Sequence, residues 1–417
     1  MNEKLSARVV FLAVVAAIGG ILFGYDTAVI SGTTEVVKMQ FGLSTGGEGG
    51  YVGCALIGSI LGVAVAGMLS DFLGRKKTML ISAVLFSVSA IGCALCADFT
   101  QLVIFRIVGG FGIGIVSIVS PVYISEVSPA QIRGTMVSLY QLFITIGFLL
   151  AYLANYLILK GTSMAEYWRP MLGAEAIPDL LFLVLIFFIP ESPRWLAVRG
   201  QRQDNSEAWK ALREKGILKA VLIGSAIAIL GQFMGVNAVL YYGPKIFSDA
   251  GFEDPLFSTV LVGVVNMLTT VLALAIIDKV GRKQLVWWGV GGMIFCLLMI
   301  GLYFLPFTSL PTWFMLGFFL LYVFCTAISI SAVVFVLLSE MYPNRVRGLA
   351  MSIAGFALWI GTYLIGQLTP WMLEHLTPAG TFFLFAFMCI PYLVIMYKCV
   401  PDTTGKSLEE IEAYWKR

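Results

Sequence analysis

Two ionisable side chains lie inside apolar stretches of the sequence and are the first candidates for chemistry. Asp26 follows Gly24 and Tyr25 in one stretch, and Arg106 lies in another. An unpaired charge in the core of a bilayer costs at least roughly 2.5–3.5 kcal/mol, so we expect the two residues to pair. Protonation of Asp26 from outside would weaken its attraction to Arg106, and proton release inside would restore it. The alternative is a static ion pair that only joins the two segments.

A second group of charges lies at the polar ends of apolar stretches. Its arginines can pair bidentately with nearby glutamates and interact with the carboxyl ends of helices. We interpret the group as a cytoplasmic gate between two halves of the protein. Its ion pairs would form when the cytoplasmic side of the protein closes and break when that side opens. The alternative is that the positive charges only mark the cytoplasmic side. The residues are Arg75, Glu126, Arg133, Glu191, Arg194, Arg282, Glu340 and Arg347.

The composition places these charges in a membrane protein. Of 417 residues, 59% are hydrophobic and 12% are charged, and the mean hydropathy is +0.91, which is too apolar for a water-soluble domain. The net charge of +3 gives no reason to expect nucleic-acid binding. Cys93 and Cys96 form an isolated pair within an apolar stretch, so we expect no metal site and no cofactor. The absence of a nucleophile–base constellation in the sequence argues against an enzyme.

Twelve apolar stretches are long enough to cross a bilayer as helices, which takes about 20 residues each. We therefore predict an all-α membrane protein with twelve transmembrane helices. The stretches lie near residues 8–31, 51–70, 78–97, 101–124, 136–159, 171–190, 217–247, 257–277, 284–305, 312–338, 349–372 and 381–400.

The basic residues indicate which side of the membrane each connection faces. With twelve spans, 22 of the 27 lysine and arginine residues fall on the side of the two termini, and Arg106 lies within a span. Only Lys38, Lys160, Arg169 and Lys245 fall on the opposite side. Because cytoplasmic loops are enriched in positive charge, both termini are predicted to be cytoplasmic. Gly46–Gly50, on the other side, predicts a flexible external turn.

An internal repeat divides the chain into two parts. Residues 70–76 resemble residues 277–283, and residues 125–134 resemble residues 339–348, each pair in equivalent connections. Two matches in the same order indicate duplication, and parallel repeats of this kind are a transporter architecture. The predicted parts are a six-helix half at 1–190, a cytoplasmic linker with a short helix at 191–219, and a second six-helix half with a short tail at 220–417.

The motifs together resemble the sugar porters of the major facilitator superfamily, most closely those of the bacterial proton-coupled D-xylose type. The resemblance covers nearly the whole chain and rests on several motifs in order. They are Gly24-Tyr-Asp26, the two Asp-x-x-Gly-Arg-Lys loops, Pro121-Val-Tyr-Ile-Ser-Glu126, Pro190-Glu-Ser-Pro-Arg-Trp195, Gln232-Phe-Met-Gly-Val-Asn237, Tyr241-Tyr242, and the segment from Ser339-Glu340 to Arg347-Gly348. It implies a major facilitator fold and a proton-coupling role for Asp26.

The resemblance also implies a sugar site at the midplane between the halves. Amides can donate to and accept from sugar hydroxyls, and aromatic rings suit the C–H face of a sugar. The matching positions are Phe23, Gln141, Gln232, Asn237, Tyr242, Asn266, Phe335 and Trp359. The family pattern leads us to expect glutamines where this chain has Phe148, Gly231 and Leu358, tryptophan at Phe335, and Gly-Pro at Ser331-Ala332. These departures leave the preferred sugar open.

The sequence as a whole predicts an alternating-access monosaccharide transporter of the cytoplasmic (inner) membrane. D-xylose is the leading substrate, D-glucose or a related sugar is an alternative, and protons are the expected driving ion. The rival interpretations are a facilitative sugar uniporter and a sugar sensor that does not transport. The expected partners are the monosaccharide, protons and the lipid bilayer. The oligomeric state is left open, with a monomer as one alternative.

Overall fold

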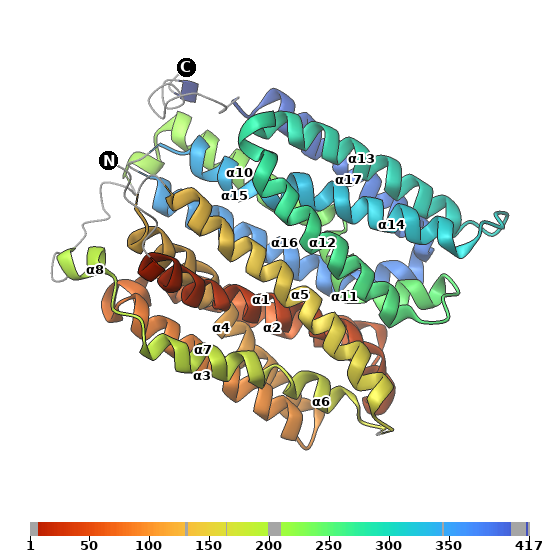
Figure 1. Ribbon diagram of the computed structural model, residues 1–417. Coiled ribbons are helices and arrows are strands. Elements are labelled where there is room, and N and C mark those ends of the chain that lie inside the picture. The colour runs from red at the N-terminus through yellow and green to blue at the C-terminus, as the bar shows by residue number, and fades with distance from the viewer. Residues whose placement is uncertain are drawn as a thin grey trace. The chain divides into compact units, whose positions relative to one another are not determined.

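The computed structural model describes residues 7–129, 132–163, 165–198, 210–343, 346–401 and 414–415. These residues are almost entirely helical and contain no strand, which confirms the all-α prediction (Figure 1). Up to residue 198 the helices are α1 (Ala7–Phe41), α2 (Thr45–Leu73), α3 (Arg75–Leu95), α4 (Phe99–Val127), α5 (Arg133–Gly161), α6 (Trp168–Gly173), α7 (Ala176–Phe187) and α8 (Pro193–Val198).

The helices after residue 210 continue the same all-helical pattern. They are α10 (Lys215–Phe233), α11 (Val236–Asp249), α12 (Pro255–Val280), α13 (Arg282–Tyr303), α14 (Thr312–Thr326), the π-helix η1 (Ala327–Ser331), α15 (Ala332–Met341), α16 (Arg347–His375) and α17 (Thr377–Lys398). Among the described residues, 12 helical stretches are long and apolar enough to cross a membrane, as predicted. Three of these stretches are interrupted, because they consist of α6 with α7, α10 with α11, and α14 with η1 and α15.

The chain forms two compact units. The first unit contains Met1–Gln201, Leu240–Lys245 and Asp254–Met267, and the second contains Arg202–Val239, Ile246–Glu253 and Leu268–Arg417. The boundaries predicted at 190 and 219 stay predictions. The short helix predicted in the linker covers residues 206–216. Its first four residues, 206–209, lie outside the described residues, and residues 210–212 are helical.

Two closely packed helix pairs, α1 with α5 and α2 with α4, build the first unit (Figure 1). Glycines lie at both contacts and allow backbone to approach backbone. A methyl group at Gly110 would overlap the carbonyl oxygen of Ala55, and one at Gly24 would overlap that of Ile144. Small residues are how membrane helices gain van der Waals contact without a hydrophobic driving force. The glycine run at residues 109–114 is thus a packing surface.

Replacing Gly110 with Ala tests this packing. The added methyl group would meet rigid backbone, so we expect the free energy of unfolding to fall by about 1–3 kcal/mol, the usual cost of overpacking. Gly67 on α2 is the matched control, because no atom lies within 4 Å of a methyl group built there. Thermal unfolding of the purified variants in detergent measures the effect. Equal stability of the Gly110→Ala and Gly67→Ala proteins would contradict the packing account.

The second unit contains a helix break beside a predicted site residue. Gly235 separates α10 from α11 with a φ of +91°, a conformation that favours glycine. The hydroxyl of Tyr322 donates to the carbonyl oxygen of Met234 at 2.7 Å and so satisfies a backbone group at the break. α10 packs against α16, and α13 packs against α14 and α17. The break leaves Gln232 near the end of α10 and Asn237 at the start of α11.

The turn predicted at Gly46–Gly50 is wrong, because these residues form the first turns of α2. The side chain of Ser44 accepts a hydrogen bond from the backbone N–H of Gly47 and caps the helix. Glu48 is buried and binds two lysines of the same unit, Lys38 at 2.6 Å and Lys245 at 3.0 Å. Capping and this ion cluster outweigh the low helix propensity of the glycines.

Candidate functional site

The first unit brings Asp26 and Arg106 together as a buried ion pair. Asp26 lies on α1 and Arg106 on α4, and their exposed fractions are 1% and 2%. The Nη1 atom of Arg106 donates to the Oδ1 atom of Asp26. Gly109 allows α4 to lie close to α3 and α1, since a side chain there would overlap Ser89 and contact Asp26. The pair predicted from sequence therefore forms, while its role in proton coupling stays a prediction.

Two acidic residues that the sequence analysis overlooked lie next to this pair. Glu175 and Asp179 are 3% and 0% exposed, and both lie at the junction of α6 and α7. Their charges interact with that of Asp26, and the carboxyl group of Glu175 lies within hydrogen-bonding reach of Asp26. Two acidic residues four positions apart in the predicted span 171–190 were the available indication. Ionisable residues within a span are candidates for function by the argument that applies to Asp26 and Arg106.

The carboxyl groups of Asp26 and Glu175 are placed so that they can share one proton. The Oδ2 atom of Asp26 and the Oε1 atom of Glu175 have no donor among the described residues. Two ionised carboxylates only accept hydrogen bonds, so they cannot bond to each other. A single proton between them supplies the missing donor and removes a like-charge repulsion. The site can therefore hold a proton next to a fixed guanidinium charge.

The second unit groups three polar side chains at the break between α10 and α11. The Oε1 atom of Gln232 accepts from Nδ2 of Asn237 and from the hydroxyl of Thr362 at 3.2 Å. Gln232 and Asn237 are only half-buried, so they remain reachable for a small polar molecule. Thr362, on α16, was not predicted as a site residue. Its position one turn after Trp359, a predicted site residue, was the available sequence indication.

The other predicted sugar-site residues are distributed over both units. In the first unit, Phe23 and Gln141 are half-buried on α1 and α5, and Tyr242 and Asn266 are buried on α11 and α12. In the second unit, Trp359 is buried on α16, and Phe335 lies on α15. The role of these residues in sugar binding stays a prediction.

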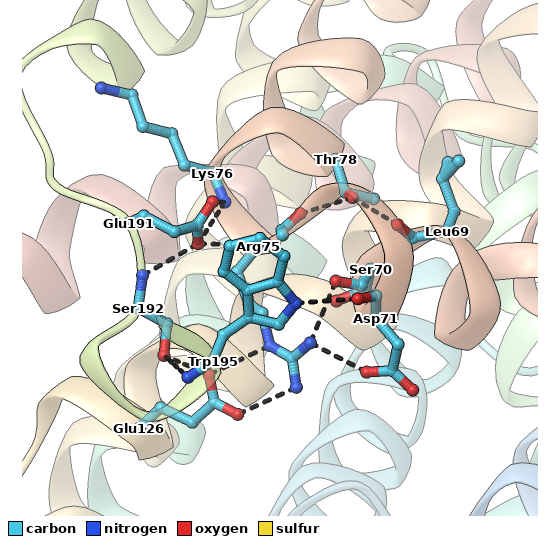
Figure 2. A network of polar contacts seen from close by, with 11 residues as sticks. Leu69, Ser70, Asp71, Arg75, Lys76, Thr78, Glu126, Glu191, Ser192 and Trp195 are labelled. Atoms are coloured by element: carbon cyan, nitrogen blue, oxygen red, sulfur yellow. Dashed lines mark hydrogen bonds and ion pairs between the residues drawn. The ribbon is translucent and has the colours of Figure 1, made fainter. Parts of the chain in front are cut away.

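Three of the predicted gate residues of the first unit, Arg75, Glu126 and Glu191, form a connected polar network, which Figure 2 shows. Arg75, at the start of α3, donates to both carboxylate oxygens of Glu126 on α4, at 3.0 Å each. The backbone N–H groups of Arg75 and Lys76 donate to Glu191 at 2.9 and 3.1 Å. The hydroxyl of Ser192 donates to Glu126 at 2.6 Å. The network thus ties the α2–α3 connection and α4 to the segment after α7.

The second unit repeats the central pair of this network. Arg282 donates to Glu340 at 3.0 Å, and the internal repeat relates these residues to Arg75 and Glu126. Each pair joins residues of its own unit and braces it. Exchange of partners between the halves, as the predicted gate requires, stays a prediction.

The remaining gate residues have different surroundings. Arg133 is exposed and donates to the carbonyl oxygen of Ser125 at 3.0 Å. Arg347 donates to the carbonyl oxygen of Tyr342 at 3.4 Å. Arg194, on α8, is exposed. The structure therefore does not gather all the predicted gate residues into one cluster.

Comparison with known proteins decides the family. The family described as "Sugar (and other) transporter" matches residues 12–215 and again residues 199–415. The chain belongs to this sugar transporter family. The two successive matches agree with the internal repeat found in the sequence. The protein is thus a multi-pass membrane transporter and not an enzyme.

Several relatives of this family cover almost all of the chain. The D-xylose-proton symporter of Escherichia coli (strain K12) is 37% identical over 100% of this chain and 98% of its own length. The arabinose-proton symporter of Bacillus subtilis (strain 168) is 37% identical over 98% and 95%, respectively. The glucose transporter of Staphylococcus epidermidis is 34% identical over 98% and 97%.

Solved structures of the family agree in fold. An inward-open structure of the xylose transporter from E. coli is 36% identical, has a TM-score of 0.85, and covers 98% of this chain and 100% of that chain. A proton:xylose symporter bound to 6-bromo-6-deoxy-D-glucose is 36% identical, with a TM-score of 0.82 over 98% and 99%. These similarities confirm the predicted major facilitator fold.

Proposed function

We propose that this sugar transporter is a proton-coupled monosaccharide symporter with Asp26 as its proton-coupling residue. The observation that carries the proposal is the buried Asp26–Arg106 pair in a protein of this family. A facilitative uniporter needs no titrating carboxylate inside the membrane, where such groups are costly. Two relatives at 37% identity bear the name of proton symporters, which supports the same conclusion.

In the proposed mechanism, Asp26 switches between pairing and not pairing with Arg106. An external proton neutralises Asp26 and removes most of its attraction to the guanidinium, which favours the separation of α1 from α4 at this point. Release of the proton to the cytoplasm restores the pair. Because protonation has different free energies in the two arrangements, it biases the equilibrium between outward-open and inward-open states.

The proposed sugar site uses the uncharged polar groups described above. Gln232, Asn237 and Thr362 offer donors and acceptors next to a helix break, and transporters commonly bind substrates at interrupted helices. Gln141 and Asn266 would add amides, and the predicted aromatic residues would contact C–H faces of the sugar. D-xylose is the proposed substrate. D-glucose is the second candidate, because the relatives include a glucose transporter and a symporter structure that holds a glucose derivative.

Replacing Gly231 with Gln restores an amide that the family pattern leads us to expect. A Cβ atom there would meet Tyr392 at 3.7 Å and Ile330 at 3.8 Å, which are ordinary contacts. One added hydrogen bond to the sugar is worth about 0.5–1.5 kcal/mol, so we expect the affinity to rise roughly twofold to tenfold. Isothermal titration with D-xylose and D-glucose measures it. Gly231→Met is the control of similar volume, and an equal gain with Met would exclude the hydrogen bond as the cause.

Uptake into liposomes tests the proposed function and its rivals. Labelled D-xylose and D-glucose are supplied separately, with and without an inward proton gradient. Symport predicts accumulation above the equilibrium level only with the gradient, and the ratio of the two rates gives the preferred sugar. Equilibration that ignores the gradient would identify a uniporter. Sugar binding without uptake would identify a sensor.

We further propose that the transporter lies in the cytoplasmic membrane with both termini in the cytoplasm. The support is the charge distribution, in which 22 of 27 basic residues fall on the side of the termini. The network around Arg75 would then lie at the cytoplasmic ends of the first-unit helices. Cysteine labelling with an impermeant reagent tests this orientation, after removal of the natural cysteine Cys399, which is half-buried. Labelling of a cysteine placed at Lys4 in intact cells would contradict it.

A further inference from the structure

The α6–α7 junction places another buried carboxyl group beside the Asp26–Arg106 pair. Asp179 lies in the first turn of α7 and is fully buried, and neither of its oxygens has a hydrogen-bond partner among the described residues. Buried polar atoms are nearly always partnered in native proteins, because burial removes their hydrogen bonds to water. Burial of an unpaired carboxylate costs more free energy than burial of a neutral polar group, since the carboxylate also carries a charge. A carboxyl group avoids that cost by binding a proton.

The charged neighbours of Asp179 do not neutralise it. α7 packs against α1 and α3. The carboxyl group of Asp179 interacts with those of Asp26 and Glu175, while the guanidinium of Arg106 interacts with Asp26 and Glu175. Full ionisation of the three carboxyl groups beside one guanidinium would leave two negative charges in excess away from water. The titratable and charged groups of this cluster are Tyr25 and Asp26 of α1, Cys93 of α3, Arg106 of α4, and Glu175 at the α6–α7 junction.

Among the described residues, Arg106 is the one cation of this cluster, and it already pairs with Asp26. Arg106 donates to Asp26, and Asp179 accepts from no described donor. The amino end of α7 favours an anion. Complete burial and the negative charge of Asp26 both disfavour the ionised form of Asp179. One proton between Asp26 and Glu175 leaves one negative charge in excess. Asp179 is the carboxyl group of this cluster whose two oxygens both lack a donor among the described residues.

We propose that Asp179 is an additional proton-binding residue of the first unit, and that it holds a proton while Asp26 is ionised against Arg106. The two groups are then linked by their charges. The negative charge of Asp26 strengthens proton binding at Asp179, and loss of the Asp179 proton would strengthen proton binding at Asp26. Resting on the proposed function, this linkage would keep Asp26 able to bind protons at higher pH than it could alone.

Infrared spectroscopy of the full-length protein in lipid nanodiscs tests the proton on Asp179 directly. The carbonyl stretching band of a protonated carboxylic acid is separate from that of a carboxylate and shifts in heavy water. At neutral pH we expect Asp179→Asn to remove one protonated component, and Asp26→Asn to retain that component. Unchanged intensity of the protonated band in Asp179→Asn would overturn the proposal.

A second variant covers the case in which Asp179→Asn does not fold. Asp179→Glu keeps a carboxyl group at the position. In protein labelled with ¹³C at the carboxyl carbon of aspartate, the wild-type band shifts with the label. In Asp179→Glu the acid at position 179 is an unlabelled glutamic acid, so its band should not shift with the aspartate label. An aspartate-labelled component of unchanged size in Asp179→Glu would again overturn the proposal.

The pH dependence of transport tests the linkage. Neutral asparagine at position 179 cannot acquire the negative charge that strengthens proton binding at Asp26. We therefore expect the alkaline limb of proton-driven uptake to move to lower pH in Asp179→Asn. An unshifted limb would refute the linkage. If uptake is not proton-driven but the infrared component is lost, the proposed function fails and the proton site stands. If uptake is proton-driven and the component persists, only the site fails.

Discussion

Replacing Asp26 with Asn is expected to abolish accumulation of sugar above the equilibrium level while sugar binding persists. Asparagine has the shape of aspartate and can still accept a hydrogen bond from Arg106, but it cannot be ionised or bind a proton. The variant resembles the protonated form at every pH, so a proton gradient has nothing to act on. Arg106 also loses its counter-charge in a buried position, which adds a structural cost.

Two assays in liposomes separate these effects. Proton-driven accumulation measures coupling, and exchange of labelled for unlabelled sugar measures binding and movement of the carrier without net proton flow. We expect loss of the first and retention of the second. Glu253→Gln is the control, because it removes an exposed carboxylate between α11 and α12. Accumulation by Asp26→Asn at the level of Glu253→Gln would exclude Asp26 as the coupling residue.

Replacing Glu126 with Gln is expected to cause a large loss of stability. The side chains of Arg75 and Glu126 are only 12% and 6% exposed, and Glu126 also accepts from Ser192. Removing one partner of a buried pair leaves an uncompensated charge and typically costs about 3–5 kcal/mol. The network would lose the contact that joins α3 to α4 at this end of the first unit.

Thermal unfolding of single and double variants measures this coupling. Glu126→Gln and Arg75→Gln should each lower the unfolding temperature, and the double variant should lose less than the sum of the two. Asp71→Asn is the matched control, because Asp71 also binds Arg75 but its side chain is 62% exposed. Exposed pairs contribute about 0–1 kcal/mol, so the control should unfold near the wild-type temperature. A similar small change in Glu126→Gln would mean that the network does not stabilise the unit.

The positions of the membrane helices could be predicted from sequence because span length and apolar composition are local properties. The predicted span 101–124, for example, lies within α4. Glu175 and Asp179 were missed because span prediction averages hydropathy over about 20 residues, and two acidic residues barely change that average. Their proximity to Asp26 depends on how α7 packs against α1, which no local pattern specifies. The break at Gly235 likewise depends on tertiary contacts such as the bond from Tyr322.

The sugar site could be predicted only as a set of residue types. Gln232 and Asn237 are five positions apart, and the break between α10 and α11 is what lets their side chains bond to each other. Thr362 joins them from α16, a long way along the chain, and was therefore missed. The turn predicted at Gly46–Gly50 failed for the opposite reason, because local propensity was followed where the buried Glu48 and its lysines decide the structure.

Sugar-driven proton movement is the most direct test of the central claim. Liposomes containing the transporter are suspended in weakly buffered solution without any gradient, and D-xylose is added outside while the external pH is recorded. Symport predicts that the external pH rises as sugar and protons enter together, and that Asp26→Asn abolishes the rise although it still binds the sugar. Entry of labelled xylose at the wild-type rate with no change in external pH would contradict proton coupling.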